Sequence, residues 1–179
     1  PKAKEALHHF FQREDTLSIG ICNGCQLFIE LGLMTPSHEN KPKMLHNASG
    51  KFECTFTSVQ ITENNTPMFA SFAGQTLGIW SAHGEGNFQF PYNKDHYNII
   101  GTFGYDDFPA NPNGSQFATA IMATDDGRHV VSMPHMERSI FPYNWAHYPK
   151  DRTDEVSPWI QAFVNAYQWL ESLNERKKT

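Results

Sequence analysis

The stretch TLSIGICNGCQLFIELGL, residues 16–33, decides the fold of this chain. Residues 16–22 form a short apolar run that is typical of a buried strand. The pair Asn23-Gly24 then predicts a tight turn, and residues 26–33 carry apolar side chains at helical spacing. A strand that leads into a helix through a tight turn is typical of α/β proteins, so we expect that class.

Periodic apolar residues predict further elements on both sides of this stretch. Two more helices are expected, and the second opens with an N-cap serine and a proline at the first helical position. The strand-like runs suit antiparallel or mixed pairing, and the last two form a hairpin around an Asp-Gly turn. The helices are residues 2–13, with Pro1 in the first turn, and 157–170; the strands are residues 52–61, 77–81, 118–123 and 129–133.

Size and charge exclude several classes of protein. The 179 residues fit one domain, and a hydrophobic content of 39% supports a folded core. The net charge of -5 offers no basic face to neutralise phosphates, so we expect no nucleic-acid partner. No apolar run approaches the roughly 20 residues of a membrane span, so no membrane partner is expected either.

The cysteine count and the first residues bear on location and completeness. Three cysteines without a signal peptide indicate a reducing cytoplasm and no disulfides. The chain begins at Pro1 without an initiator Met and enters a helical pattern at once. We therefore expect a single domain over residues 1–179 that was cut from a larger protein.

Cys22 occupies the position of a nucleophile. Gly20 and Gly24 flank it where the strand feeds the helix, and glycines there permit the cramped backbone of a nucleophile elbow. The start of the next helix aims N–H groups and its positive dipole end at the sulfur, which favours a thiolate. The alternative is a small buried cysteine that only packs.

Cys22 and Cys25 also form a C-x-x-C pair, which could be a redox pair or half of a zinc site. A zinc site needs about two more ligands at matched spacing, and only Cys54 and scattered histidines remain. We therefore expect no metal site, and a redox pair of Cys22 and Cys25 remains an alternative.

A thiol nucleophile needs a base, and His135 is the best candidate. It follows the predicted hairpin within the segment PHMER, residues 134–138. Residues two apart on an extended segment point to the same side, so Glu137 could hold one ring nitrogen while the other faces Cys22. The alternative is a solvated histidine, as expected for His38, His46 and other histidines in loops.

Six ordered segments carry a family resemblance. The first two, GICNGCQ and PHMER, resemble the class I, triad-type glutamine amidotransferases. The other four narrow the resemblance to the C-terminal glutaminase domain of the phosphoribosylformylglycinamidine synthases, from about Leu17 to Leu170. Those four segments are NASGKFE (residues 47–53), WSAHGEG (80–86), NPNGS (111–115) and SPW (157–159).

The resemblance implies a fold and three catalytic roles. The fold would be a three-layer, flavodoxin-like α/β fold with a mostly parallel sheet and an antiparallel extension. Cys22 would attack the carboxamide carbon of glutamine, His135 would move the proton to the departing ammonia, and Glu137 would orient the imidazole.

The same resemblance implies binding residues for L-glutamine. The N–H group of Asn23 would be one oxyanion donor, and Gln26 would hold the substrate. The stretch His83-Gly84-Glu85 would meet the amino-acid end of glutamine, or else form a loop packed beside the site. Family members carry the second oxyanion donor on a Gly-rich loop after a first strand, and neither precedes Pro1.

The partner implied by the resemblance is a synthetase domain of the same polypeptide or complex, and the long single polypeptide fits better. That domain would use ATP and Mg to convert formylglycinamide ribonucleotide to the amidine of purine biosynthesis. No cofactor is expected in this chain, which lacks a G-x-x-x-x-G-K-[ST] loop. Alternatives are a non-catalytic docking domain, a C-x-x-C redox or metal protein, and the cysteine peptidases and γ-glutamyl hydrolases that share the elbow.

Overall fold

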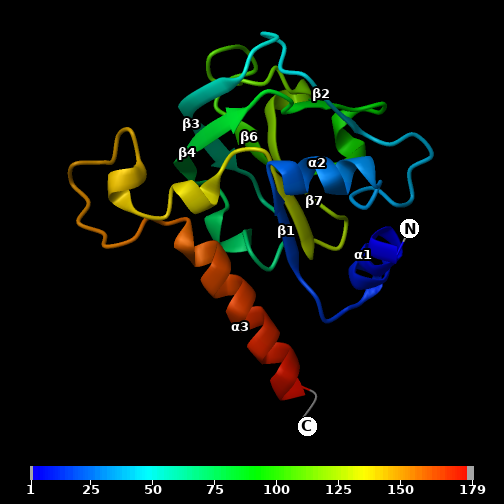
Figure 1. The fold of residues 1–179 in the computed structure, drawn as a ribbon. Coiled ribbons are helices and arrows are strands. Elements are labelled where there is room, and N and C mark those ends of the chain that lie inside the picture. Colours follow the sequence, from blue (N-terminus) through cyan, green and yellow to red (C-terminus); the bar gives the residue numbers. More distant parts are fainter. Residues whose placement is uncertain (1, 177–179) are drawn as a thin grey trace.

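A computed structural model describes residues 2–176, and the expected helical position of Pro1 lies outside them. The helices are α1 (Lys2–Gln12), α2 (Asn23–Glu30) and α3 (Ile160–Arg176). One sheet has six strands in the order β1-β8-β7-β6-β3-β4 (Figure 1). Their bounds are β1 Ser18–Ile21, β3 Glu53–Ile61, β4 Thr76–His83, β6 Asn98–Phe103, β7 Thr119–Ala123 and β8 His129–Ser132; β2 (Lys43–Leu45) and β5 (Asn87–Gln89) form a separate pair.

The sheet is mixed, and its strand directions differ from the expectation of a mostly parallel sheet. Within the described residues only β1 and β8 run parallel, and the other four neighbouring pairs of the large sheet are antiparallel. The reason lies in the connections. A helix follows β1, whereas a short turn containing Gly127 at φ 73 joins β7 directly to β8. Such short connections give antiparallel neighbours.

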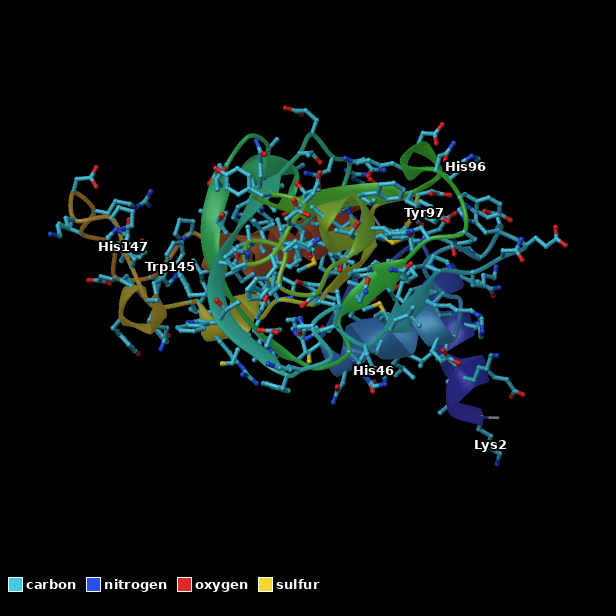
Figure 2. All side chains as sticks on the ribbon, turned by 90° about the horizontal axis from the view of Figure 1, so that it is seen from above. Lys2, His46, His96, Tyr97, Trp145 and His147 are labelled. Carbon is cyan, nitrogen blue, oxygen red and sulfur yellow. The ribbon has the colours of Figure 1, made fainter. Side chains whose placement is uncertain are left out.

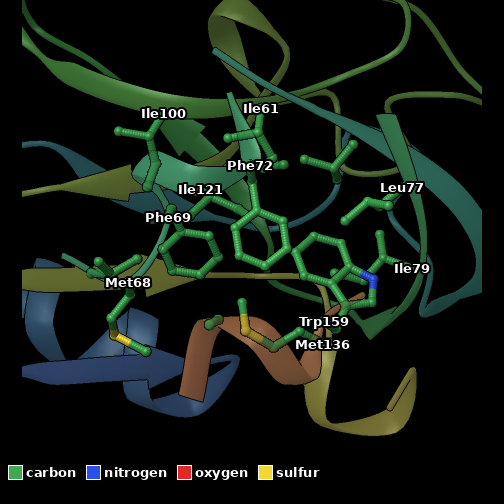
Figure 3. Packing of buried hydrophobic residues seen from close by; sticks show 14 of the residues in the cluster. Ile61, Met68, Phe69, Phe72, Leu77, Ile79, Ile100, Ile121, Met136 and Trp159 are labelled. Carbon is green, nitrogen blue, oxygen red and sulfur yellow. The ribbon is translucent and has the colours of Figure 1, made fainter. Parts of the chain in front are cut away.

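Helices cover both faces of the sheet, which confirms the layered α/β class. Neighbouring residues of β7 alternate between the two faces: Ile121 belongs to a core with the start of α3, and Met122 to a core with α2. The first core includes Trp159, Phe69 and the aromatic rings shown in Figure 3. The site described below lies at the end of β1, where α2 begins.

Two parts of the chain extend from this body. Beyond the buried Ala162, helix α3 leads away from the sheet and exposes apolar side chains such as Tyr167 (Figure 1). The loop over residues 141–156 carries His147 outward, while Trp145 lies near the base of the loop (Figure 2). Trp145 ties its base to the sheet by packing on Phe56. No helix among residues 2–176 is long and apolar enough to cross a membrane.

Candidate active site

Cys22 forms the turn between β1 and α2 with a strained backbone. Its φ of 52° and ψ of -106° lie in a region that non-glycine residues rarely adopt. Its N–H donates to the Ser132 carbonyl at 2.9 Å, and its carbonyl accepts from the Gln26 N–H at 3.0 Å. These bonds fix the sharp turn that lifts the sulfur above the end of the sheet, as in a nucleophile elbow.

Glycine is required at residue 20, before the elbow, because atoms of α2 approach its backbone closely. A Cβ on Gly20 would lie 2.7 Å from the carbonyl oxygen of Gly24 and 2.9 Å from the ring of Phe28. A Cβ on Gly24 would meet nothing within 4 Å. Of the two glycines that flank Cys22, only Gly20 is therefore needed for the packing of α2 on β1.

The surroundings of Cys22 favour the protonated form of its thiol at neutral pH. Burial raises its pKa above the ordinary value, and this outweighs the lowering by the backbone of Asn23 at the start of α2 and by the charge of Arg138. The sequence predicted the opposite balance from the position of the thiol at a helix start. Cys22 therefore depends on a neighbouring base to become a nucleophile.

The fold brings His135, the predicted base, close to Cys22. Its Nδ1 lies 2.5 Å from Oε1 of Glu137, and its side chain is almost fully buried. Burial opposes ionisation of Glu137, but the hydrogen bond from His135 and the nearby charges together lower its pKa. A carboxylate so placed fixes the ring with its Nε2 free toward the sulfur.

The backbone around His135 is anchored on both sides. The N–H of His135 donates to the Trp80 carbonyl of β4 at 2.7 Å. The next residue, Met136, is buried in the core beside Trp159 (Figure 3). Residues Met136–Arg138 form a 3₁₀ turn rather than the extended segment assumed from the sequence, and this turn brings Glu137 back to its histidine.

A second histidine completes the group. His83 ends β4, and its ligand-capable nitrogen lies within 4.8 Å of both Cys22 Sγ and the corresponding nitrogen of His135. Its Nε2 is paired with Oδ1 of Asn113 at 2.7 Å. Burial lowers the pKa of His83 to about 4, so its ring is neutral near pH 7.

Buried amides hold the loop that follows His83. Asn47 donates to the His83 carbonyl at 2.7 Å and accepts from the Gly86 N–H at 3.0 Å. Ser115 donates to the Gly86 carbonyl, and the backbone of Asn113 accepts from Ala48. The segments NASGKFE and NPNGS, whose roles the sequence did not reveal, thus form a scaffold for the His83 loop.

The other residues predicted to bind glutamine lie around this group. Asn23 is exposed at the start of α2, next to Cys22. The side chain of Gln26 donates to the Glu85 carbonyl at 2.8 Å, so it ties α2 to the His83-Gly84-Glu85 stretch. The Glu85 carboxylate lies 3.4 Å from His46 and faces solvent. Their roles in binding remain predictions.

The remaining cysteines do not contribute to this site. Cys25 belongs to α2 and is fully buried in the core that this helix covers, and burial raises its pKa well above the ordinary value. Cys54 is exposed on β3, and all three cysteines are free thiols. Because burial disfavours its thiolate form, Cys25 is a poor redox partner for Cys22. This argues against the hypothesis that the C-x-x-C pair is a redox pair.

Comparisons with known proteins point to one family. The profile of the CobB/CobQ-like glutamine amidotransferase domain matches residues 1–170. A probable phosphoribosylformylglycinamidine synthase, chloroplastic/mitochondrial, of Arabidopsis thaliana is 40% identical over 91% of this chain. The phosphoribosylformylglycinamidine synthase of Homo sapiens is 37% identical over 94% of the chain. The chain spans only 13% and 15% of the lengths of these two relatives.

Solved structures agree with this family. The structure of PurLQS from Thermotoga maritima matches with a TM-score of 0.65 and 28% identity, covering 86% of this chain and 62% of that one. The structure of a glutamine amidotransferase from Thermotoga maritima matches with a TM-score of 0.50 at 15% identity, covering 98% of this chain and 56% of that one. The second match supports the fold alone.

Proposed function

Because this chain belongs to the CobB/CobQ-like glutamine amidotransferase domain family, we propose that it hydrolyses L-glutamine to glutamate and ammonia through a thioester on Cys22. The observation that carries the proposal is the spatial group of Cys22, His135 and Glu137. These residues come from the elbow and from a 3₁₀ turn more than 100 positions later, yet they meet at one end of the sheet.

The first half of the reaction uses the proton on Cys22. Nε2 of His135 accepts it as the sulfur attacks the carboxamide carbon of glutamine, and Glu137 stabilises the imidazolium. The resulting oxyanion takes a hydrogen bond from the N–H of Asn23 at the start of α2. His135 then gives the proton to the amide nitrogen, the C–N bond breaks and ammonia leaves, and the glutamyl group remains on Cys22 as a thioester.

The second half restores the enzyme. His135 takes a proton from water, the hydroxide attacks the thioester carbon, and the proton returns to the Cys22 sulfur as glutamate leaves. The buried, neutral His83 offers its Nδ1 lone pair to a donor of the bound glutamine. Gln26 acts mainly by holding the His83-Gly84-Glu85 stretch in place, since its amide nitrogen is engaged there.

The ammonia is proposed to serve a synthetase partner. The curated relatives are phosphoribosylformylglycinamidine synthases, and this chain spans 13–15% of the two quoted above. We infer that ammonia made here feeds an ATP- and Mg-dependent conversion of formylglycinamide ribonucleotide in purine synthesis, in the same polypeptide or complex. The compartment follows the parent enzyme: we propose the cytoplasm, although one relative is named chloroplastic/mitochondrial.

A glutamine-like electrophile tests the proposal even where turnover is slow. The chain is incubated with a diazo-ketone analogue of glutamine, and labelled peptides are mapped by mass spectrometry. We expect label on Cys22 alone, protection by glutamine, and loss of label in His135→Ala. Cys25→Ala is the matched control and should label as the parent chain does. Equal labelling of Cys22 and Cys54 that glutamine does not reduce would favour the non-catalytic docking domain.

A further inference from the structure

The donor atoms of Cys22, His83 and His135 form one compact group. The three come from the elbow, from the end of β4 and from the turn after β8, and their ligand-capable atoms all lie within 4.8 Å of one another. His83 and His135 are 3% and 5% exposed. Nδ1 of His83 and Nε2 of His135 are buried, and neither has a hydrogen-bond partner among the described residues.

In each of the two histidine rings, one nitrogen (the outer nitrogen) has a hydrogen-bond partner and the other (the inner nitrogen) has none. The partner of the outer nitrogen determines whether the inner nitrogen carries a hydrogen or a lone pair. Nδ1 of His135 pairs with the Glu137 carboxylate at 2.5 Å, and Nε2 of His83 pairs with the Asn113 amide oxygen at 2.7 Å. Both partners are acceptors, so each neutral ring carries its hydrogen on the outer nitrogen. Nδ1 of His83 and Nε2 of His135 then carry free lone pairs, and a ring nitrogen of each residue lies within 4.8 Å of the Cys22 sulfur. Histidines that bind metal are supported in this way by carboxylates and carbonyl oxygens.

We propose that Cys22, His83 and His135 bind a divalent transition-metal ion, with Zn²⁺ the best fit, and that the bound ion blocks the nucleophile. One thiolate and two imidazoles suit Zn²⁺ and exclude Mg²⁺ and Ca²⁺, which require oxygen ligands. This goes beyond the proposed function, because it concerns a state of the site in which glutamine cannot react.

Binding requires only a small adjustment. Zn–S and Zn–N bonds of about 2.3 and 2.0–2.1 Å place tetrahedral donors roughly 3.5 Å apart, so donors that already lie within 4.8 Å of one another need to close by only about 1 Å. The Cys22 thiol releases its proton to solvent as the Zn–S bond forms, and the two imidazoles bind in their neutral forms. The fourth position remains open to water.

The metal prediction made from the sequence considered a different ligand set. It paired Cys22 with Cys25 and found too few further ligands, whereas Cys25 is buried on the core side of α2. The two histidines that join Cys22 here lie 61 and 113 positions away along the chain, and no local spacing connects them.

Zinc and cobalt binding test the site without relying on turnover. The full chain is titrated with Zn²⁺ in competition with a chromogenic chelator, and with Co²⁺ to detect the thiolate-to-cobalt absorption band. We expect one tight equivalent per chain. We also expect a loss of affinity of at least about tenfold in both Cys22→Ser and His83→Gln, with loss of the thiolate band in Cys22→Ser. Cys54→Ser, which alters an exposed thiol outside the group, should leave both unchanged.

Two results would overturn the proposal: zinc affinity unchanged in Cys22→Ser and His83→Gln, or tight zinc binding that disappears in Cys54→Ser. Failure of the metal site and failure of the proposed glutaminase function give different results. A chain that binds zinc at Cys22 but takes no diazo-ketone label keeps the metal site and loses the glutaminase. A chain that labels at Cys22 but binds no zinc does the reverse.

Discussion

Nδ1 of His135 lies 2.5 Å from Oε1 of Glu137, and the 3₁₀ turn of residues 136–138 creates this contact. The same turn buries Met136 in the core, so the pair is held by packing as well as by its hydrogen bond. The geometry leaves Nε2 of His135 as the only ring nitrogen of that residue that can serve Cys22.

Glu137→Gln tests the importance of that contact. An amide keeps the shape but cannot stabilise the imidazolium, so kcat for ammonia release should fall by roughly 10²-fold or more with little change in KM. The free energy of unfolding should change by about 1 kcal/mol or less, because Glu137 is partly exposed. Steady-state kinetics and urea unfolding measure both quantities. Unchanged kcat would remove Glu137 from the mechanism.

Gly20→Ala and Gly24→Ala form a matched pair. The new Cβ at residue 20 meets the Gly24 carbonyl at 2.7 Å, so the first change should lower the free energy of unfolding by about 1–3 kcal/mol and displace Cys22. The second has open space within α2 and should stabilise the chain by about 0.5–1 kcal/mol. Urea unfolding reports stability. Equal effects of the two changes would contradict the account of the elbow.

His83 should make stability depend on pH. Its folded pKa of about 4 lies below the ordinary 6.5, so only the unfolded chain binds the proton between those values. Above about pH 6.5 the ring is neutral in both states, so His83 does not lower the free energy of unfolding. As the pH falls from 6.5 toward 4, the free energy of unfolding drops by about 3 kcal/mol in total because of this residue. His129, whose pKa burial also lowers, acts in the same direction.

The pH dependence of the free energy of unfolding, compared between variants, separates the effect of His83 from that of other titrating groups. Free energies of unfolding measured from pH 7 to about 4 should fall less steeply in His83→Gln than in the parent chain, whereas His9→Gln, at an exposed position of α1, should follow the parent. Parallel curves for His83→Gln and the parent chain would mean that His83 is not held neutral.

Cys22 should react slowly with a non-specific reagent at neutral pH. Because burial raises the pKa of its thiol, alkylation by iodoacetamide should keep rising beyond the ordinary value of 9.0. The rate is measured by peptide mapping between pH 6 and 10 in the parent chain. A plateau reached below pH 7 would show instead that Cys22 rests as a thiolate paired with His135.

The local parts of this fold could be predicted from the sequence. The elbow at Cys22, the hairpin before His135 and the long helix after Ser157 each depend on short patterns, and the structure has all three. Three strands were missed: β2 and β5, because three residues carry too little periodicity, and β6, in which Gly101 interrupts the apolar run. The strand directions were misjudged. The helix after β1 suggested a mostly parallel sheet, but strands such as β7 and β8 are joined by short turns and run antiparallel.

The candidate site was predicted only in part for a similar reason. The proximity of Glu137 to His135 could be inferred because the two residues are neighbours in sequence. The pairing of Asn113 with His83 and of Asn47 with the His83 loop joins segments that lie 30 or more positions apart. A buried Asn in a Pro-Asn-Gly segment indicates a turn, but it does not reveal which backbone or ring the amide will meet.

The most direct test of glutamine hydrolysis at Cys22 is to trap the thioester. The chain is mixed with glutamine, quenched in acid within the first turnover and mapped by mass spectrometry. The account predicts one glutamyl group on the peptide that contains Cys22, released by hydroxylamine and absent in Cys22→Ala. Glutamate formed without any adduct, or an adduct carried by Cys25 or Cys54, would contradict it.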